Sequence, residues 1–149
     1  RVALFALCDA YQEEKITNHK SQITNKSKIQ NSKSESGEAD TRTVLKLHPR
    51  LAPYKAAVFP LLANKPGLVK KAEEIYHDLQ KEFMIAWDER GNIGKRYRAQ
   101  DEAGTPYCLT VDFETLADGT VTVRDRDTMG QERIDISRIP SYLREKLSL

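Results

Sequence analysis

From Thr43 to the C-terminus, short apolar segments alternate with amphipathic ones, and this order restricts the fold to a sheet covered by helices. The helices predicted after Asn64 and Asn92 each join two apolar strands, and strands joined through a helix run parallel. Asp118-Gly119 and Met129-Gly130 are typical of turns between antiparallel strands. The sequence therefore predicts an α/β domain of three layers, a mixed sheet of about five strands with helices on both faces.

The periodicity of apolar residues places the individual elements. Apolar residues at spacings of three and four predict helices over 66–83, 92–103 and 140–147. Continuous or alternating apolar runs predict strands over 44–47, 56–59, 83–87, 107–113, 120–127 and 133–136. In the strand 120–127 the alternation puts Arg124 and Arg126 on one face and Asp125 and Asp127 on the other.

The first 42 residues have a different composition. Residues 1–15 contain the apolar stretch Val2–Tyr11, which predicts the terminal helix of a truncated further domain; a helix docked back onto residues 43–149 is the alternative. Residues 16–42 have no aromatic residue and repeat Ile-Thr-Asn, so they cannot bury enough surface to offset the cost of ordering the backbone. They are predicted to be a disordered, flexible linker, with a basic RNA-binding arm as the alternative.

Several classes of function find no support in the sequence. There is no run of about 20 apolar residues for a membrane span and no signal peptide, which predicts a soluble, cytoplasmic protein. Neither a G-x-G-x-x-G motif nor a phosphate-binding P-loop occurs. His19, His48 and His77 have no partner at metal-ligand spacing, so no metal site is expected. Cys8 and Cys108 lie far apart, and Cys108 is predicted to be a small buried apolar residue.

Two segments, 94–107 and 123–128, concentrate charged side chains suited to nucleic-acid binding. Arginine can hydrogen-bond base edges or stack on a base, and carboxylates accept hydrogen bonds from the exocyclic amino group of cytosine. The residues predicted to bind RNA are Arg96, Arg98, Asp101, Glu102, Thr105, Arg124, Asp125, Arg126 and Asp127. The alternative for the Arg/Asp alternation is a ladder of cross-strand ion pairs on a solvated sheet face.

Several motifs occur in the order found in one known family. The run Leu47–Val58 is followed by G-K-R-Y-R with D-E-A-G-T-P, then by T-V-D-F and finally by T-V-T-V-R-D-R-D-T-M. This pattern, from about Thr43 to the end, resembles the C-terminal anticodon-binding domain of dimeric, class II glycyl-tRNA synthetases. Related domains end the histidyl, prolyl and threonyl enzymes of the same subgroup.

The resemblance implies a module that docks the anticodon stem-loop of glycine tRNA, whose anticodons share cytosine at the last two positions. Glu102, Asp125 and Asp127 would then accept from the cytosine amino groups, and the arginines would hold phosphates or stack. From Thr43 onward there are 17 basic and 16 acidic residues, so we expect placed contacts rather than bulk charge to bind the RNA.

The resemblance also describes the protein around this module. The full-length enzyme would be a homodimer that aminoacylates tRNA with ATP and magnesium. Residues 1–11 resemble the end of its catalytic domain, and Arg1 corresponds to an arginine that contacts ATP there. An isolated arginine cannot hold ATP, so no catalytic residue and no cofactor are expected in this chain. Residues 16–34 resemble an insertion in the family's linker.

Two other functions stay open at this point. One is a non-enzymatic accessory subunit that uses the same fold for protein contacts, as in the processivity factor of mitochondrial DNA polymerase. The other is a small flavodoxin-like enzyme, which the missing phosphate loop disfavours.

Overall fold

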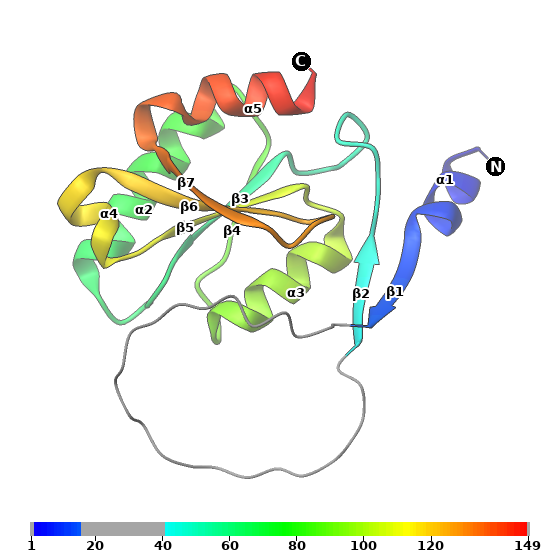
Figure 1. Cartoon of the computed structure of the whole chain (residues 1–149), viewed down its shortest axis with the longest axis horizontal. Helices are drawn as coiled ribbons and strands as arrows, with labels where there is room; N and C mark the ends of the chain where they lie inside the picture. Colours follow the sequence, from blue (N-terminus) through cyan, green and yellow to red (C-terminus); the bar gives the residue numbers. More distant parts are fainter. Residues whose placement is uncertain (1, 16–40, 149) are drawn as a thin grey trace, which may run out of the picture.

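The structure is a computed structural model that describes residues 2–15 and 41–148. Its centre is a five-stranded sheet in the order β4-β3-β5-β6-β7 (Figure 1). The strands are β3 (Ala56–Pro60), β4 (Ile85–Trp87), β5 (Tyr107–Val111), β6 (Thr120–Asp125) and β7 (Gln131–Asp135). β3 runs parallel to β4 and β5, whereas β5–β6 and β6–β7 pair antiparallel. The predicted three-layer mixed sheet is confirmed.

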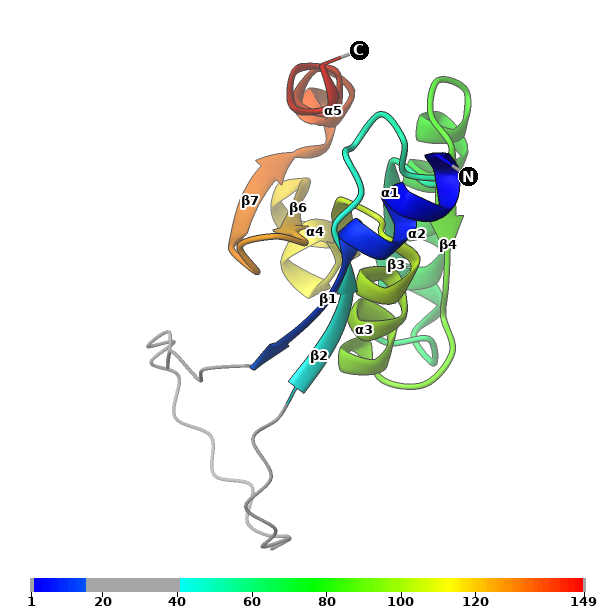
Figure 2. The ribbon, with the colours of Figure 1, turned by 90° about the vertical axis from the view of Figure 1, so that its right-hand side faces the viewer.

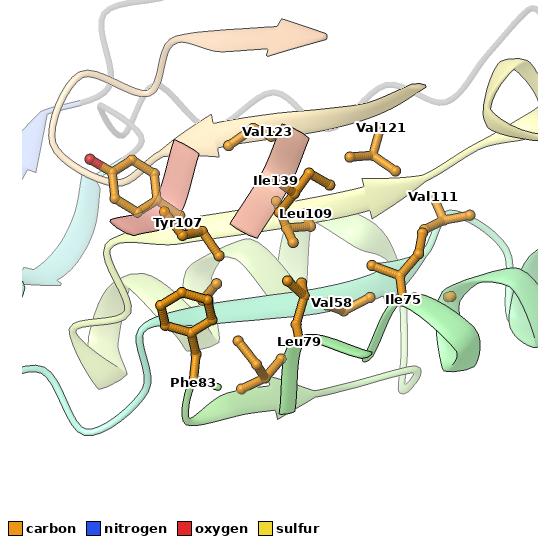
Figure 3. Close-up of a cluster of buried hydrophobic side chains, with 14 of the residues drawn as sticks. Val58, Ile75, Leu79, Phe83, Tyr107, Leu109, Val111, Val121, Val123 and Ile139 are labelled. Atoms are coloured by element: carbon orange, nitrogen blue, oxygen red, sulfur yellow. The ribbon is translucent and has the colours of Figure 1, made fainter. Parts of the chain in front are cut away.

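One face of the sheet carries the larger hydrophobic core, against helices α2 (Pro66–Gln80) and α5 (Ile139–Leu147). The apolar stripe of α2, from Leu68 to Leu79, is buried as its spacing predicted. Figure 3 shows side chains of α2, α5 and the central strands meeting in this layer, with Leu109 and Val58 between them. A fully buried side chain of this size contributes roughly 1.5–3 kcal/mol, so this layer is the main source of stability.

The other face is covered by α3 (Ile93–Ala103), whose contact with the sheet is narrower. Ile93 and Tyr97 of α3 pack on Phe59 and Cys108, as the narrow apolar stripe predicted. Asn92 caps the helix by accepting from the Lys95 amide at 2.9 Å. The helix ends at Gly104, whose φ of +79° a residue with a side chain rarely adopts.

The N-terminal part differs from the prediction for residues 1–15 and 16–42. α1 (Val2–Ala10) is followed by a strand, β1 (Tyr11–Lys15), which pairs antiparallel with β2 (Thr41–Leu45). Figure 2 shows this β1–β2 ribbon as a separate unit beside α3, outside the five-stranded sheet. The domain therefore begins before Thr43, because Arg42 is already buried in it. The predicted linker and insertion over residues 16–40, and Arg1, lie outside the described residues.

The segment between β5 and β6 also differs from the predicted hairpin. β5 ends at Val111, and a short helix, α4 (Phe113–Asp118), follows it. Asp112 caps α4 with a reciprocal pair of hydrogen bonds to Thr115. Gly119, with φ of +69°, ends the helix, so Asp118-Gly119 is a helix terminus and not a two-residue turn.

Candidate nucleic-acid interface

Two of the predicted RNA-binding residues, Asp101 and Arg124, form an ion pair inside the protein. Arg124 donates from Nη1 to Asp101 Oδ1 at 2.9 Å and from Nη2 to Oδ2 at 3.1 Å. Arg42 of β2 also donates to Asp101 Oδ2, at 3.1 Å. The Arg124 guanidinium lies over the ring of Tyr97, 4.8 Å from its centre. Burial disfavours the charged form of Arg124, but its pKa is raised because the bonds to Asp101 outweigh that cost.

Arg126 and Thr105 are buried as well. Arg126 donates to three backbone carbonyls, those of Gly104 (2.8 Å), Leu45 (3.1 Å) and Leu47 (2.9 Å). It thereby fastens β2 and the chain after it to the end of α3. Thr105 donates its hydroxyl proton to Gln100 Oε1 at 2.6 Å.

Arg96 joins two loops in the same manner. Its guanidinium donates to the carbonyls of Glu89, Arg90 and Gly91, at 2.8 to 3.2 Å, and to that of Pro60 at 2.5 Å. These carbonyls belong to the loop before α3 and to the end of β3. Such a fork of donors can satisfy carbonyls that no strand or helix reaches.

These contacts correct the predicted site. Five of its residues are at most 6% exposed and serve the fold, so none of them offers a surface to RNA in this structure: Arg96, Asp101, Thr105, Arg124 and Arg126. The ladder of surface ion pairs, the alternative, is not found either, because Arg124 pairs with a helix beneath it and not across the sheet. The physical reason is that α3 covers this part of the sheet, which strand alternation alone cannot reveal.

The other four predicted residues lie at two places. Arg98 and Glu102 are exposed on α3. Asp125 and Asp127 lie at the turn from β6 to β7, where Asp125 Oδ1 accepts from the amides of Asp127 and Thr128. Asp127 also pairs with Arg126, at 2.8 Å. A direct role in RNA binding stays a prediction for these four.

The structure shows a different candidate site at the carboxyl ends of β3 and β5. In open α/β sheets, ligands bind in the crevice outside these strand ends. Pro60 and Val111 are register partners there, and the Leu61 amide donates to Val111 O at 2.8 Å. A groove of about 560 Å³ opens at this edge, lined by Leu61, Asp112, Phe113, Glu114, Thr122, Gln131, Glu132 and Arg133.

Two further hollows continue the groove around Leu61. One, of about 230 Å³, reaches Tyr97 and Thr110 on the α3 side of the sheet. The other, of about 450 Å³, reaches Asn92 and the start of α3. We call the three together the strand-end groove.

Arg133 of β7 presents its guanidinium in a fixed orientation in this groove. Asp112 accepts from Nη1 at 2.8 Å and from Nη2 at 3.3 Å, and Thr120 Oγ1 accepts from Nε at 2.9 Å. Glu114 lies 3.0 Å from the same guanidinium. Burial alone would raise the pKa of Asp112, but hydrogen bonds from Arg133 and Thr115 outweigh it and lower the pKa. The guanidinium plane is therefore held without a bound ligand.

The groove combines flat and hydrogen-bonding groups. Phe113 is 52% exposed at its edge, and unpaired bases stack on aromatic rings and on guanidinium planes. Gln131, Glu114 and Glu132 supply oxygen atoms that can accept from exocyclic amino groups. In the 560 Å³ hollow, Asp112, Glu114 and Glu132 outnumber Arg133, the one cation among its lining residues, so this part of the groove suits bases better than phosphates.

Cations flank the groove on the side of the α3 N-terminus. Lys65 and Arg90 adjoin lining residues in sequence, and Lys95 lies one turn into α3, beside Gly91. A nucleic acid with its bases in the groove could place phosphates here. The sequence prediction missed Phe113, Gln131 and Arg133. Phe113 and Gln131 lie at or near strand ends, a signal that could have found them, whereas Arg133 lies in the middle of β7 and carries no such signal.

Neither a membrane span nor a metal site is present in the part of the chain that the structure describes. Within residues 2–15 and 41–148 no helix has the length and apolarity needed to cross a bilayer. In the same ranges no group of three His, Cys, Asp or Glu residues could hold a metal ion.

The sequence is similar to one family model and to several known proteins. The family model described as "Anticodon binding domain" matches residues 55–146. The glycine–tRNA ligase of Clostridium perfringens is 47% identical over 147 residues, and that of Clostridium beijerinckii 49%. The glycine–tRNA ligase of Rhodopirellula baltica is 46% identical. The alignments cover 99% of this chain but only 24 to 27% of these relatives, so the chain spans about a quarter of their length.

Proposed function

The chain belongs to the anticodon-binding domain family, and we propose that it is the module with which a glycyl-tRNA synthetase binds the anticodon stem-loop of its tRNA. The observation that carries this proposal is the strand-end groove, where an exposed ring, a fixed guanidinium plane and several acceptor oxygens meet. Single-stranded loops suit such a surface because their bases can be splayed out, stacked and read on their pairing edges.

The proposal assigns the bases to the groove and the phosphates to its flank. Glycine anticodons share two cytosines, whose amino groups need acceptors, and Glu114 and Gln131 provide them. Phe113 and Arg133 supply the stacking surfaces, at roughly 1–3 kcal/mol for each stacked base. Lys65, Arg90 and Lys95 would contact the backbone, which makes the binding dependent on salt.

Within the whole protein, we propose that this module is attached to a catalytic domain and that the ligase is a homodimer in the cytoplasm. ATP and magnesium would be used in that catalytic domain. The described residues contain no group of three His, Cys, Asp or Glu residues that could hold a metal ion, and Arg1, which corresponds to the arginine that contacts ATP in the family, lies outside them. The relatives reported above are named glycine–tRNA ligase, which favours this function over that of an accessory subunit. The matching family model favours an anticodon-binding domain over a flavodoxin-like enzyme.

A titration with two RNAs tests the proposal. The first is a stem-loop carrying a glycine anticodon, and the second is the same stem-loop with both cytosines replaced by uracil. We expect weak, salt-sensitive binding of the first and clearly weaker binding of the second, because uracil offers an acceptor where cytosine offers an amino donor. Equal affinities for the two RNAs would refute recognition of the anticodon by the groove.

A further inference from the structure

A buried chain of contacts begins at the β1–β2 ribbon. Arg42 of β2 donates to Glu14 Oε2 of β1 from both Nε, at 3.0 Å, and Nη2, at 2.5 Å. Its remaining terminal nitrogen, Nη1, donates to Asp101 Oδ2 in α3 and to the Arg126 carbonyl. Arg42 is 3% exposed, and its bonds to Asp101 and to the Arg126 carbonyl are buried, so one side chain links the ribbon with α3 and with the residue that follows β6.

The same chain continues to the strand-end groove. The Asp101 carboxylate holds both terminal nitrogens of Arg124, whose guanidinium covers the Tyr97 ring. Tyr97 forms a hydrogen bond of 2.6 Å between its hydroxyl and Thr110 Oγ1. Both Tyr97 and Thr110 line the 230 Å³ hollow of the groove.

Shared partners make the members of this chain dependent on one another. The guanidinium groups of Arg42 and Arg124 face the carboxylates of Asp101 and Glu14, and Lys46 also pairs with Glu14. Asp101 Oδ2 accepts from both arginines. If Arg42 moves away, the Asp101 carboxylate keeps its hydrogen bonds to Arg124 only. The carboxylate can then shift together with Arg124, which changes the position of the Arg124 guanidinium over Tyr97. Buried ions cannot replace a lost partner with water at low cost.

We infer that Asp101 is a positioning residue that ties the wall of the strand-end groove to the β1–β2 ribbon, so that nucleic acid in the groove and the position of the ribbon are energetically coupled. The second half of this inference rests on the proposed function. Coupling of this kind is reciprocal: whatever holds the ribbon also changes the affinity of the groove. β1 follows α1 directly, so a shift of the ribbon also moves α1.

The first experiment uses the free protein and needs no RNA. Arg42→Gln removes the link between ribbon and Asp101, whereas Lys46→Gln removes another cation that contacts Glu14 on the same ribbon but does not touch Asp101. In NMR spectra we expect Arg42→Gln to shift the resonances of Tyr97 and Thr110, which it does not touch, and Lys46→Gln to leave them unchanged. If Arg42→Gln folds and its Tyr97 and Thr110 resonances are unshifted, the link between the ribbon and the groove wall is refuted. If Arg42→Gln does not fold, Glu14→Gln takes its place.

The second experiment adds the glycine anticodon stem-loop. We expect Arg42→Gln to weaken its binding about fivefold and Arg42→Lys, which can keep one bond to Asp101, to recover part of the loss. Binding should slow hydrogen exchange of the Thr41–Leu45 amides in the wild-type chain and not in Arg42→Gln. Protection of the groove amides without any change in the ribbon would overturn the coupling. If the stem-loop protects no amide of the groove from hydrogen exchange, both the proposed function and the coupling are refuted. The NMR shifts of the free protein still test, independently of RNA, whether the ribbon is linked to the groove wall.

Discussion

Asp101 and Arg124 form a two-point ion pair in which both carboxylate oxygens and both terminal guanidinium nitrogens are used. The Asp101 side chain is 1% exposed and that of Arg124 is 8% exposed. A pair so completely removed from water holds the two elements that carry it, α3 and β6, in one relative position.

Asp101→Asn should therefore destabilise the domain strongly. The substitution keeps the shape of the side chain but leaves the guanidinium groups of Arg42 and Arg124 without their shared carboxylate. Removing one partner of a buried pair costs about 3–5 kcal/mol. The free energy of unfolding, measured by urea denaturation, reports the loss. Asp78→Asn, at an exposed pair with Lys81, is the control and should leave stability nearly unchanged; a similar small effect of Asp101→Asn would contradict the interpretation.

The glycines at the ends of α3 and α4 allow the close approach of β2 to be measured. Gly104 and Gly119 both have positive φ, but a Cβ on Gly104 would lie 3.0 Å from the Leu45 carbonyl oxygen, whereas one on Gly119 would meet nothing within 4 Å. Gly119→Ala should cost about 1 kcal/mol from backbone strain alone. Gly104→Ala should cost clearly more, because backbone atoms of β2 must also move. Equal melting temperatures of the two variants would contradict this.

Acid should weaken the β5–α4 region through Asp112. Its pKa is lowered in the folded protein from an ordinary value of 3.8, because the bonds from Arg133 and Thr115 outweigh the opposing effect of burial. A lowered pKa gives stability that is present above the ordinary value and is lost as the pH falls through the folded value. Denaturation measured from pH 7 to pH 2 should show stability falling below about pH 4.

The Asp112→Asn variant identifies the source of this pH dependence. It should be less stable than the wild type at pH 7 and should lose less stability on acidification. Glu73→Gln, at an exposed position on α2, should follow the wild-type curve. If Asp112→Asn lost as much stability in acid as the wild type, other carboxylates would be responsible.

The two cysteines should differ sharply in reactivity. Cys8 is exposed, whereas Cys108 is 1% exposed between the sheet and α3, and burial raises the pKa of its thiol to about 12. Since the thiolate is the reactive form, a disulfide reagent at pH 8 should modify Cys8 in the native protein and Cys108 only after denaturation. Cys8→Ser should abolish the fast reaction. A rapid reaction of native Cys8→Ser would show that Cys108 is accessible.

Phe113 should contribute to RNA binding and not to stability. Phe113→Ala removes an exposed ring at the groove and should weaken binding of the glycine anticodon stem-loop about tenfold, the equivalent of one lost stacking contact. Leu116→Ala is the matched control, since Leu116 is equally exposed on α4 but does not line the groove. Isothermal titration calorimetry measures both; equal losses would show that the site lies elsewhere.

The fold itself was largely readable from the sequence, because helix and strand periods are local properties. The stripe from Leu68 to Leu79 and the cap at Asn92 are found as predicted. Cys108 is buried as expected. The helix α4 was missed because Asp118-Gly119 satisfies the end of a helix as well as a turn.

The residues of the candidate site could not be predicted from the sequence in the same way. Arg96, Arg124 and Arg126 were predicted to bind RNA because arginine can hydrogen-bond base edges or stack on a base, and because their segments resemble the motifs of the family. Arg133 was not selected, although it presents the guanidinium of the groove. For the buried arginines and for Arg133 alike, the residue type indicated the chemistry of the side chain but not which element packs against it.

The sequence alone determined the alternation of elements, the apolar layers and the family, since these depend on residue types at fixed spacings. Only the tertiary structure decided which charges are inside. α3 packs on β3 and β5 and buries Arg124 of β6 against Asp101, while β7 at the sheet edge leaves Arg133 accessible. The ribbon made by β1 and β2 likewise joins residues 28 positions apart, Glu14 and Arg42, through a contact that no local pattern encodes. Burial is a property of the whole packed chain, and it assigns each arginine either to the fold or to the surface.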